Sequence, residues 1–142
     1  MKPQTFENHA RYVPLFHFVL SAILLFNLVW TTVHLAKAPS AQHVVDVVLA
    51  VAFAIMFIYI RYFPLRVQDR VIRLEETQRI QRLAPDLAAR VGEFTVGQLV
   101  GLRFASDVEL PALARRVLDE KLTDRTAIKK LVKSWRPDYL RA

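Results

Sequence analysis

The sequence has no cysteine and only three glycines among its 142 residues. The absence of cysteine excludes disulfide scaffolds, cysteine-ligated zinc and thiol nucleophiles. A P-loop and a dinucleotide-binding fingerprint both need closely spaced glycines between a strand and a helix. The glycines here, Gly92, Gly97 and Gly101, do not meet that requirement. Several large classes of enzyme site are therefore excluded at the outset.

Charge of either sign is scarce in the first sixty residues and abundant after them. This front part holds three of the 20 lysines and arginines and two of the 13 acidic residues, and so contributes little to the net charge of +7. Hydrophobic residues make up 54% of the chain and charged residues 23%. The composition therefore predicts an apolar front joined to a basic back.

Two long apolar runs lie in the front part. The first, residues 15–35, has no formal charge over 21 residues and would be about 31 Å long as a helix, which matches the roughly 30 Å core of a bilayer. The second, residues 44–63, carries charge only near its two ends. The segment between them is too short for anything but antiparallel neighbours. We therefore predict that residues 15–63 form a two-helix transmembrane hairpin with its outer turn near residues 36–43.

A cleaved secretory signal is the alternative interpretation of the first run, because Ala36-Lys37-Ala38 resembles a small-residue cleavage site. The run is longer than the apolar core of a usual signal, and 14 residues precede it. Pro39 would also follow the cleaved bond directly. We therefore favour a retained span.

Basic residues in the short flanks of the spans predict their orientation, because such residues are retained on the cytoplasmic side. The turn holds Lys37 alone, whereas the flank before the first span holds Lys2 and Arg11. Four arginines lie at or after the end of the second span: Arg61, Arg66, Arg70 and Arg73. We therefore expect both termini to be cytoplasmic, including an N-terminal segment of residues 1–14.

One face of the first span is polar. At 100° per residue its polar members lie within a sector of about 140°. They are His17, Ser21, Asn27, Thr31 and His34. Because lipid cannot hydrogen-bond an amide or an imidazole, this face is expected to turn toward protein. A cofactor-binding stripe or proton path is one interpretation, and helix packing through Asn27 and Thr31 is the one we favour.

The second span offers a matching small-residue surface. Ala50 and Ala54 are four residues apart and would form a groove that another helix can approach closely. The groove therefore predicts a packing partner, in the same chain or in another.

The histidines are the candidate ligands for haem or metal. His17 and His34 are about 25 Å apart along one helix, which makes a bis-histidine haem within one subunit an unfavourable interpretation. His34 and His43 can meet across the turn, but two histidines without a carboxylate are a weak metal signal. We expect no metal, cofactor or catalytic residue in this chain. Whether His17 or His34 contacts a cofactor or pigment of a neighbouring subunit stays open.

Residues 64–84 have an apolar edge with charges elsewhere, which predicts an amphipathic juxtamembrane helix. Pro64 at its start predicts a kink between the span and this helix. Acid-before-base pairs at i,i+4 spacing, Asp69 with Arg73 and Glu75 with Arg79, are expected to support it. Anionic lipid headgroups are the expected partners of the flanking arginines, whose other interpretation is topology retention alone. These arginines are Arg61, Arg66, Arg70 and Arg73.

Residues 85–142 predict a small basic cytoplasmic domain of short helices, so the expected fold class is all-α. A first helix is expected between Pro85 and Gly92, and a second after Thr95 as its N-cap. The spacing of Gly97 and Gly101 predicts close packing on a neighbouring helix. A third helix is expected over about residues 111–122, and a fourth over residues 125–135 with Thr123 or Asp124 as its cap.

The end of this domain interleaves cations with aromatic residues. They are Lys129, Lys130, Lys133, Trp135, Arg136, Tyr139 and Arg141. Such a pattern suits nucleic-acid phosphates and bases, and it suits a membrane headgroup layer equally. The lipid interpretation is simpler for a domain tethered near a bilayer, and no recognition motif for nucleic acid is evident. We therefore do not expect nucleic acid as a partner.

Three blocks of the sequence carry a resemblance. They are QTFENHARYVP at residues 4–14 followed by His17-Phe18, LRVQDRVIRLE at residues 65–75, and LRFASD at residues 102–107 running on to Lys129-Lys130 and WRPDYL at residues 135–140. Together they resemble a family of small bacterial membrane proteins of unknown function with two spans and a cytoplasmic helical tail. The resemblance covers almost the whole chain, implies a bacterial inner-membrane location and supplies no catalytic residue. Relatives are sometimes labelled transporter permeases, a name that two spans without a broken-helix pair do not support.

These observations favour a non-catalytic accessory or scaffold subunit packed beside a larger bacterial inner-membrane complex of respiratory, photosynthetic or transport type. Its expected partners are anionic lipid and other membrane-protein subunits. One alternative is a membrane-tethered adaptor whose basic tail binds a cytoplasmic partner or nucleic acid. Another is an enzyme or transport component that uses His9, His17, or Asp107 with Glu109. Asp107 and Glu109 would diverge by about 200° on a helix, which argues against a cooperating pair.

Overall fold

The computed structural model describes residues 3–139, and throughout that part the regular elements are helices. The predicted all-α class is therefore confirmed. The chain divides into two compact units, with one boundary after residue 10 and the other after Pro64. We call residues 11–64 the hairpin unit, and the remaining described residues, 3–10 and 65–139, the helical unit.

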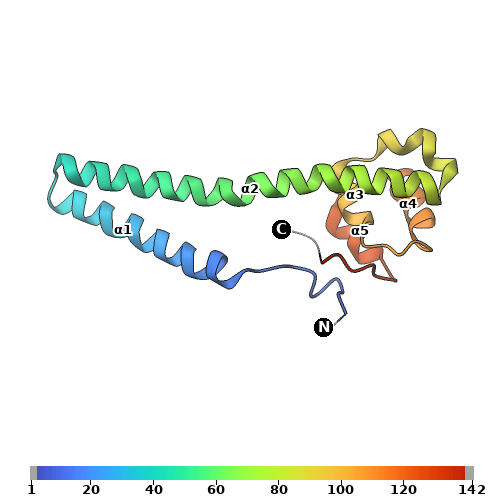
Figure 1. Ribbon diagram of the computed structural model, residues 1–142, viewed down its shortest axis with the longest axis horizontal. Coiled ribbons are helices and arrows are strands. Elements are labelled where there is room, and N and C mark those ends of the chain that lie inside the picture. Colours follow the sequence, from blue (N-terminus) through green and yellow to red (C-terminus); the bar gives the residue numbers. More distant parts are fainter. Residues whose placement is uncertain (1–2, 140–142) are drawn as a thin grey trace. The chain divides into compact units, whose positions relative to one another are not determined.

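The hairpin unit contains a π-helical turn, η1 (Leu15–Leu20), which leads directly into α1 (Ser21–Lys37). After a short turn the chain reverses into α2 (Ala41–Leu83), as Figure 1 shows. Leu15–Lys37 and Ala41–Leu83 are both long and apolar enough to cross a membrane. The two long apolar helices expected from the sequence are therefore present.

The hairpin closes through contacts near both of its ends. The rings of Phe16 and Phe57 stack with their centroids 4.6 Å apart. The rings of His34 and His43 lie 6.0 Å apart near the turn. Between these points Ala50 is only 1% exposed, which makes it the buried small residue of the α2 surface. Ring and small-residue contacts thus hold the two helices antiparallel.

A kink at Pro64 was expected between the span and the juxtamembrane helix, and Pro64 lies inside α2, which continues to Leu83. A proline in a helix interior removes one backbone hydrogen bond and crowds the preceding turn. Here the loss is one donor within a helix of 43 residues, so the element continues. Residues 64–83 of the predicted juxtamembrane segment are therefore the last part of α2, and the boundary between the two compact units falls after Pro64.

The helical unit contains the last part of α2 followed by four short helices. They are the 3-10 helix η2 (Pro85–Glu93), α3 (Val96–Leu102), α4 (Leu110–Asp119) and α5 (Arg125–Leu131). Thr95 caps α3 through a reciprocal capping box with Gln98, and Asp124 caps α5 by accepting from two backbone amides. Both N-caps are therefore at positions that the sequence indicated.

The fourth predicted helix ends earlier than expected, at Leu131 instead of residue 135. Val132 has an extended backbone, and the amides of Lys133 and Ser134 donate to the carboxylate of Glu109. Trp135 then forms an isolated antiparallel bridge with Ala105. These contacts outside α5 replace the hydrogen bonds that a longer helix would have made.

The core of the helical unit is built from α2, α3, α4 and α5. Its largest fully buried side chains include Phe104, Ile80, Leu99 and Leu110. At Gly101 the helices α3 and α5 approach so closely that an added Cβ would lie 2.8 Å from Cγ2 of Ile128. The close packing expected of the glycine pair is thus found at Gly101, whereas nothing comparable contacts Gly97.

Candidate functional site

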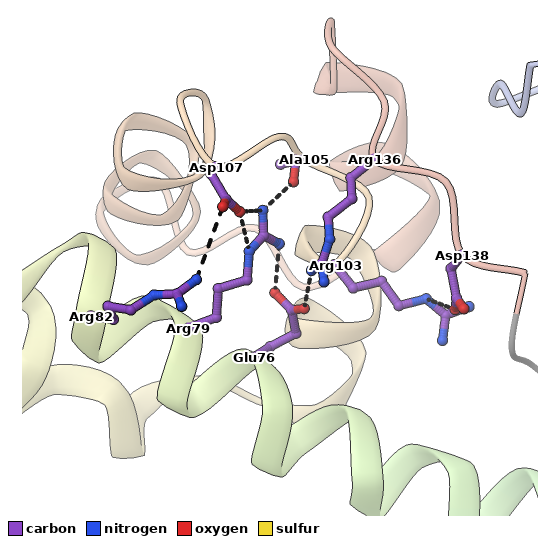
Figure 2. Close-up of polar contacts among 8 residues, drawn as sticks. All are labelled: Glu76, Arg79, Arg82, Arg103, Ala105, Asp107, Arg136 and Asp138. Carbon is purple, nitrogen blue, oxygen red and sulfur yellow. Dashed lines mark hydrogen bonds and ion pairs between the residues drawn. The ribbon is translucent and has the colours of Figure 1, made fainter.

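A buried charge network crosses the core of the helical unit. Glu76 and Arg79 lie one turn apart on α2, and their side chains are 3% and 5% exposed. Nη1 of Arg79 donates to Glu76 at 3.0 Å, and Nη2 donates to the carbonyl oxygen of Ala105 at 2.6 Å. Nε of Arg79 donates to Oδ1 of Asp107 at 2.8 Å. Figure 2 shows the guanidinium of Arg79 held between these three partners.

Arg136 extends this network and Arg103 forms a further ion pair, and both are drawn in Figure 2. Nη1 of Arg136 lies 3.4 Å from the second carboxylate oxygen of Glu76. Nε of Arg103 lies 3.5 Å from a carboxylate oxygen of Asp138, and its side chain is 8% exposed. These side chains come from α2, from the segment after α3 and from the segment after α5. The network therefore joins elements far apart in the sequence.

The pKa values of the two carboxylates that bind Arg79 shift in opposite directions. Desolvation raises the pKa of Glu76 above its usual 4.5, and the nearby Arg79 and Arg136 offset part of that effect. The hydrogen bond from Arg79 lowers the pKa of the exposed Asp107 below its usual 3.8. Of these two carboxylates, Glu76 is therefore the one whose ionised form is disfavoured in the folded state.

The described N-terminal residues, 3–10, form a strap on the helical unit. The side chain of Gln4 accepts from the backbone amide of Asp138 at 2.8 Å and donates to its carbonyl oxygen at 3.3 Å. The ring of His9 lies 5.7 Å from those of Phe104 and Trp135, and its Nε2 is 3.1 Å from Nζ of Lys129. The strap therefore joins residues about 130 positions apart.

Asp107 and Glu109, the acidic pair considered above as a catalytic candidate, bind different groups. Asp107 faces Arg79 and lies 4.0 Å from Arg82, whereas Glu109 accepts from the backbone at Lys133 and Ser134. Both carboxylates therefore make contacts that join different segments of the helical unit. Among the described residues no three histidine or acidic side chains gather as a metal site would require.

The residues considered for helix packing lie on the inward faces of the hairpin. Asn27 and Thr31 are half-buried, as are the other members of the polar face, His17, Ser21 and His34. The hydroxyl of Thr31 donates to the carbonyl oxygen of Asn27, and that of Ser21 to the carbonyl oxygen of His17. On α2, Ala50 is buried and Ala54 half-buried. The donors of these hydroxyls are therefore satisfied by backbone carbonyl oxygens one turn earlier.

The arginines considered for lipid binding fall in different surroundings. Arg61 belongs to the hairpin unit, and Arg66, Arg70 and Arg73 belong to the helical unit. Arg70 and Arg73 line a surface hollow of about 340 Å³. The predicted i,i+4 ion pair of Arg73 with Asp69 does not form, and Arg79 pairs with Glu76 and Asp107 instead of Glu75. Arg79 thus exchanges the expected partner for one local and one distant carboxylate, and Arg73 has no ion pair within the described residues.

Sequence reasoning missed Glu76 as the centre of the network. A signal was present, because Ile72 and Ile80 precede and follow it by four residues on the same helix face. Both isoleucines are buried, so a carboxylate between them is buried as well. A charged residue inside an apolar helix edge indicates a paired partner from another element.

The chain belongs to a family of unknown function (DUF6526), whose model matches residues 1–142. Neither the curated proteins nor the solved structures contain a match to the chain.

Proposed function

We propose that this family member is a non-catalytic, two-span membrane protein that serves as an accessory or scaffold subunit of a larger bacterial inner-membrane complex. The observation that carries the proposal is the exposed apolar surface of the hairpin unit. Large hydrophobic side chains are exposed along both helices, for example Phe26, Val48 and Ile58. Water does not tolerate so large an apolar surface, and lipid or the apolar side of a partner subunit covers it.

The strap supports an even number of membrane crossings. The chain leaves the helical unit after residue 10 and returns to it at residue 65. Gln4 and His9 contact residues beyond the hairpin, so the strap and the helical unit occupy the same side of the membrane. Two crossings by α1 and the apolar part of α2 satisfy this requirement.

The arginines after the second span make the cytoplasm the proposed side for the helical unit and for both ends of the chain. Lys37 is the corresponding basic residue of the turn between the helices. The proposed location is therefore the cytoplasmic membrane, with residues 38–40 facing outward.

The polar groups of the helical unit support a scaffold more than an enzyme. Arg79, Glu76, Asp107 and Glu109 each contact another part of the fold, and these contacts tie short helices to α2. This use of charge gives a rigid domain of fixed shape. A rigid domain on a lipid-embedded hairpin is suited to holding a neighbouring subunit in position.

The alternative, a membrane-tethered adaptor for nucleic acid, receives less support from the basic end of the chain. Nζ of Lys130 lies over the ring of Phe6 at 5.7 Å, and Nζ of Lys129 lies 5.2 Å from the ring of Phe104. Trp135 packs on Phe104 with ring centroids 4.6 Å apart. These cations and this aromatic ring contact the protein's own core and strap, which reduces their availability for phosphates and bases.

Cysteine labelling tests the topology in a chain with no native cysteine. Three single variants, Thr5→Cys, Ser40→Cys and Lys121→Cys, place a thiol at exposed positions in the strap, the turn and the helical unit. With an impermeant maleimide on intact cells, only the variant at position 40 is expected to react before permeabilisation. Labelling at position 5 or 121 from outside would contradict the proposed topology.

Native purification tests the subunit role. The tagged full-length chain, extracted in a mild detergent, is expected to carry the same membrane proteins in constant ratio through two successive columns, as measured by mass spectrometry. Recovery of the chain alone, after cross-linking in intact membranes as well, would contradict the accessory-subunit proposal.

A further inference from the structure

The arginines of the helical unit differ in their partners. Most have a carboxylate within 4.0 Å: Arg79, Arg82, Arg90, Arg103, Arg115, Arg116 and Arg136. Arg70 and Arg73, both on α2, have no ion pair with any residue of the described part of the chain. Two neighbouring guanidinium groups are therefore left for a ligand of opposite charge.

Both of these arginines line the same hollow, whose volume is about 340 Å³. Thr77, one turn further along α2, adds a hydroxyl, and Val91 and Gly92 at the end of η2 form the facing wall. At 100° per residue Arg70, Arg73 and Thr77 lie within about 60° of one another around the helix. The hollow thus collects two cations and a hydroxyl on one side.

The charge in this hollow is uncompensated. None of its lining residues is acidic. A second hollow of about 380 Å³ provides the contrast, because Glu76 and Asp138 line it together with Arg103 and Arg136. The first hollow therefore suits an anion, and guanidinium groups suit the oxygens of a phosphate in particular because of their forked donors.

An apolar stripe on α2 adjoins the two arginines. Val67, Val71 and Leu74 are 61%, 47% and 60% exposed, and their i, i+4, i+7 spacing places them on one face. Leu74 also lines the hollow with the arginines. A phosphate joined to a hydrocarbon chain matches this combination, whereas a free phosphate would leave the stripe uncovered.

We propose that this hollow binds an anionic phospholipid, with the phosphate between Arg70 and Arg73 and an acyl chain along Val67, Val71 and Leu74. A headgroup with no cation of its own, as in phosphatidylglycerol, fits best because a zwitterionic headgroup would bring a positive charge toward the arginines. The inference rests on the proposed membrane location, and it adds a defined site to the diffuse attraction of basic residues for a charged bilayer.

The test uses the full-length protein in a neutral detergent and measures binding of short-chain phosphatidylglycerol. The same titration with short-chain phosphatidylcholine and with inorganic phosphate separates the possible sources of the phosphate. The site variant is the double substitution Arg70→Gln and Arg73→Gln. The matched control, Lys121→Gln with Arg125→Gln, removes two exposed cations that form no ion pair within residues 3–139.

Phosphatidylglycerol is expected to bind saturably, more tightly with dioctanoyl than with dihexanoyl chains, and about thirtyfold more weakly to the site variant, as two lost contacts of roughly 1 kcal/mol each imply. The control is expected to bind like the original chain. Equal losses in both double variants would overturn the site in favour of diffuse charge. Inorganic phosphate binding as tightly as the lipid, or phosphatidylcholine doing so, would overturn the anionic-lipid assignment.

Membrane fractionation of the original chain distinguishes the two proposals. A protein extracted by carbonate without detergent would contradict the membrane proposal itself. A protein that resists such extraction but binds phosphatidylglycerol equally with and without the arginines would overturn only the lipid site.

Discussion

Arg79 and Asp107 are 28 residues apart in the sequence, and Nε of the arginine lies 2.8 Å from the carboxylate of the aspartate. The same guanidinium also binds Glu76 and the carbonyl oxygen of Ala105. One buried cation thereby connects α2 with the segment between α3 and α4. The stability of the helical unit should therefore depend on the forked shape of the Arg79 guanidinium as well as on its positive charge.

Arg79→Lys is expected to lower the free energy of unfolding of the helical unit by about 3 kcal/mol, because an ammonium cannot reproduce the forked contacts of a buried guanidinium. The measurement is a urea titration followed by Trp135 fluorescence in detergent, in a Trp30→Phe background. Arg115→Lys is the control, since its bidentate pair with Asp86 is about half-exposed and should contribute less than about 1 kcal/mol. Equal losses of unfolding free energy for the two substitutions would show that the burial of Arg79 does not determine its contribution to stability.

Gly101→Ala is expected to destabilise the same unit by about 1 to 2 kcal/mol. The new Cβ would lie 2.9 Å from Cβ of Ile128 and 3.3 Å from the carbonyl oxygen of Arg125. The free-energy cost of such overpacking exceeds the gain in helix propensity, up to about 1 kcal/mol, that alanine brings in place of glycine. The matched control is Gly97→Ala, where the nearest atom is 3.9 Å away, and it should stabilise the unit. The urea midpoints of the two variants should therefore shift in opposite directions.

The stability of the helical unit is expected to depend on pH through Glu76 and Asp107 with opposite signs. The raised pKa of Glu76 means that its contribution is fully present below pH 4.5 and is lost as pH rises through the folded-state pKa. The lowered pKa of Asp107 means that its contribution is present above pH 3.8 and is lost as pH falls through the folded-state pKa.

Glu76→Gln removes the first of these effects and should flatten the fall in stability above pH 4.5, whereas Asp107→Asn should flatten the loss at lower pH. Unfolding free energies measured between pH 3 and pH 8 check both. A Glu76→Gln variant that keeps the full decline above pH 4.5 would rule out Glu76 as its source.

Local patterns predicted the local features of this fold well. The uncharged run of residues 15–35, the cap at Thr95 and the cap at Asp124 depend on neighbouring residues alone, and the structure has each of them. The charge network was missed because Arg79 binds Asp107 from another element and Glu76 at i−3, and not Glu75 at the expected i−4 position. No spacing rule anticipates the strap, since Gln4 bonds the backbone of Asp138 and residues 3–10 show no helical or strand periodicity.

The last prediction concerns the inner face of the hairpin. Ala50 is 1% exposed, so Ala50→Leu would place three extra carbon atoms where the helices close on each other. Overpacking of this kind costs about 1 to 3 kcal/mol and should push the helices apart. A short thiol-reactive cross-linker between Phe16→Cys and Phe57→Cys reports the closure, because those rings are in contact in the original chain.

Ala52→Leu is the matched control, because the same substitution two residues later falls on an exposed face. Asn27→Leu is expected to have a smaller effect than Ala50→Leu, about 0.6 kcal/mol, since an amide in the membrane finds other partners when the helices separate. Cross-linking in membranes should therefore fall most for Ala50→Leu, slightly for Asn27→Leu and not at all for Ala52→Leu. If Ala52→Leu lowered the yield as much as Ala50→Leu, the face of α2 that packs on α1 would be the opposite one, and the inward groove of Ala50 and Ala54 would lose its role in closing the hairpin.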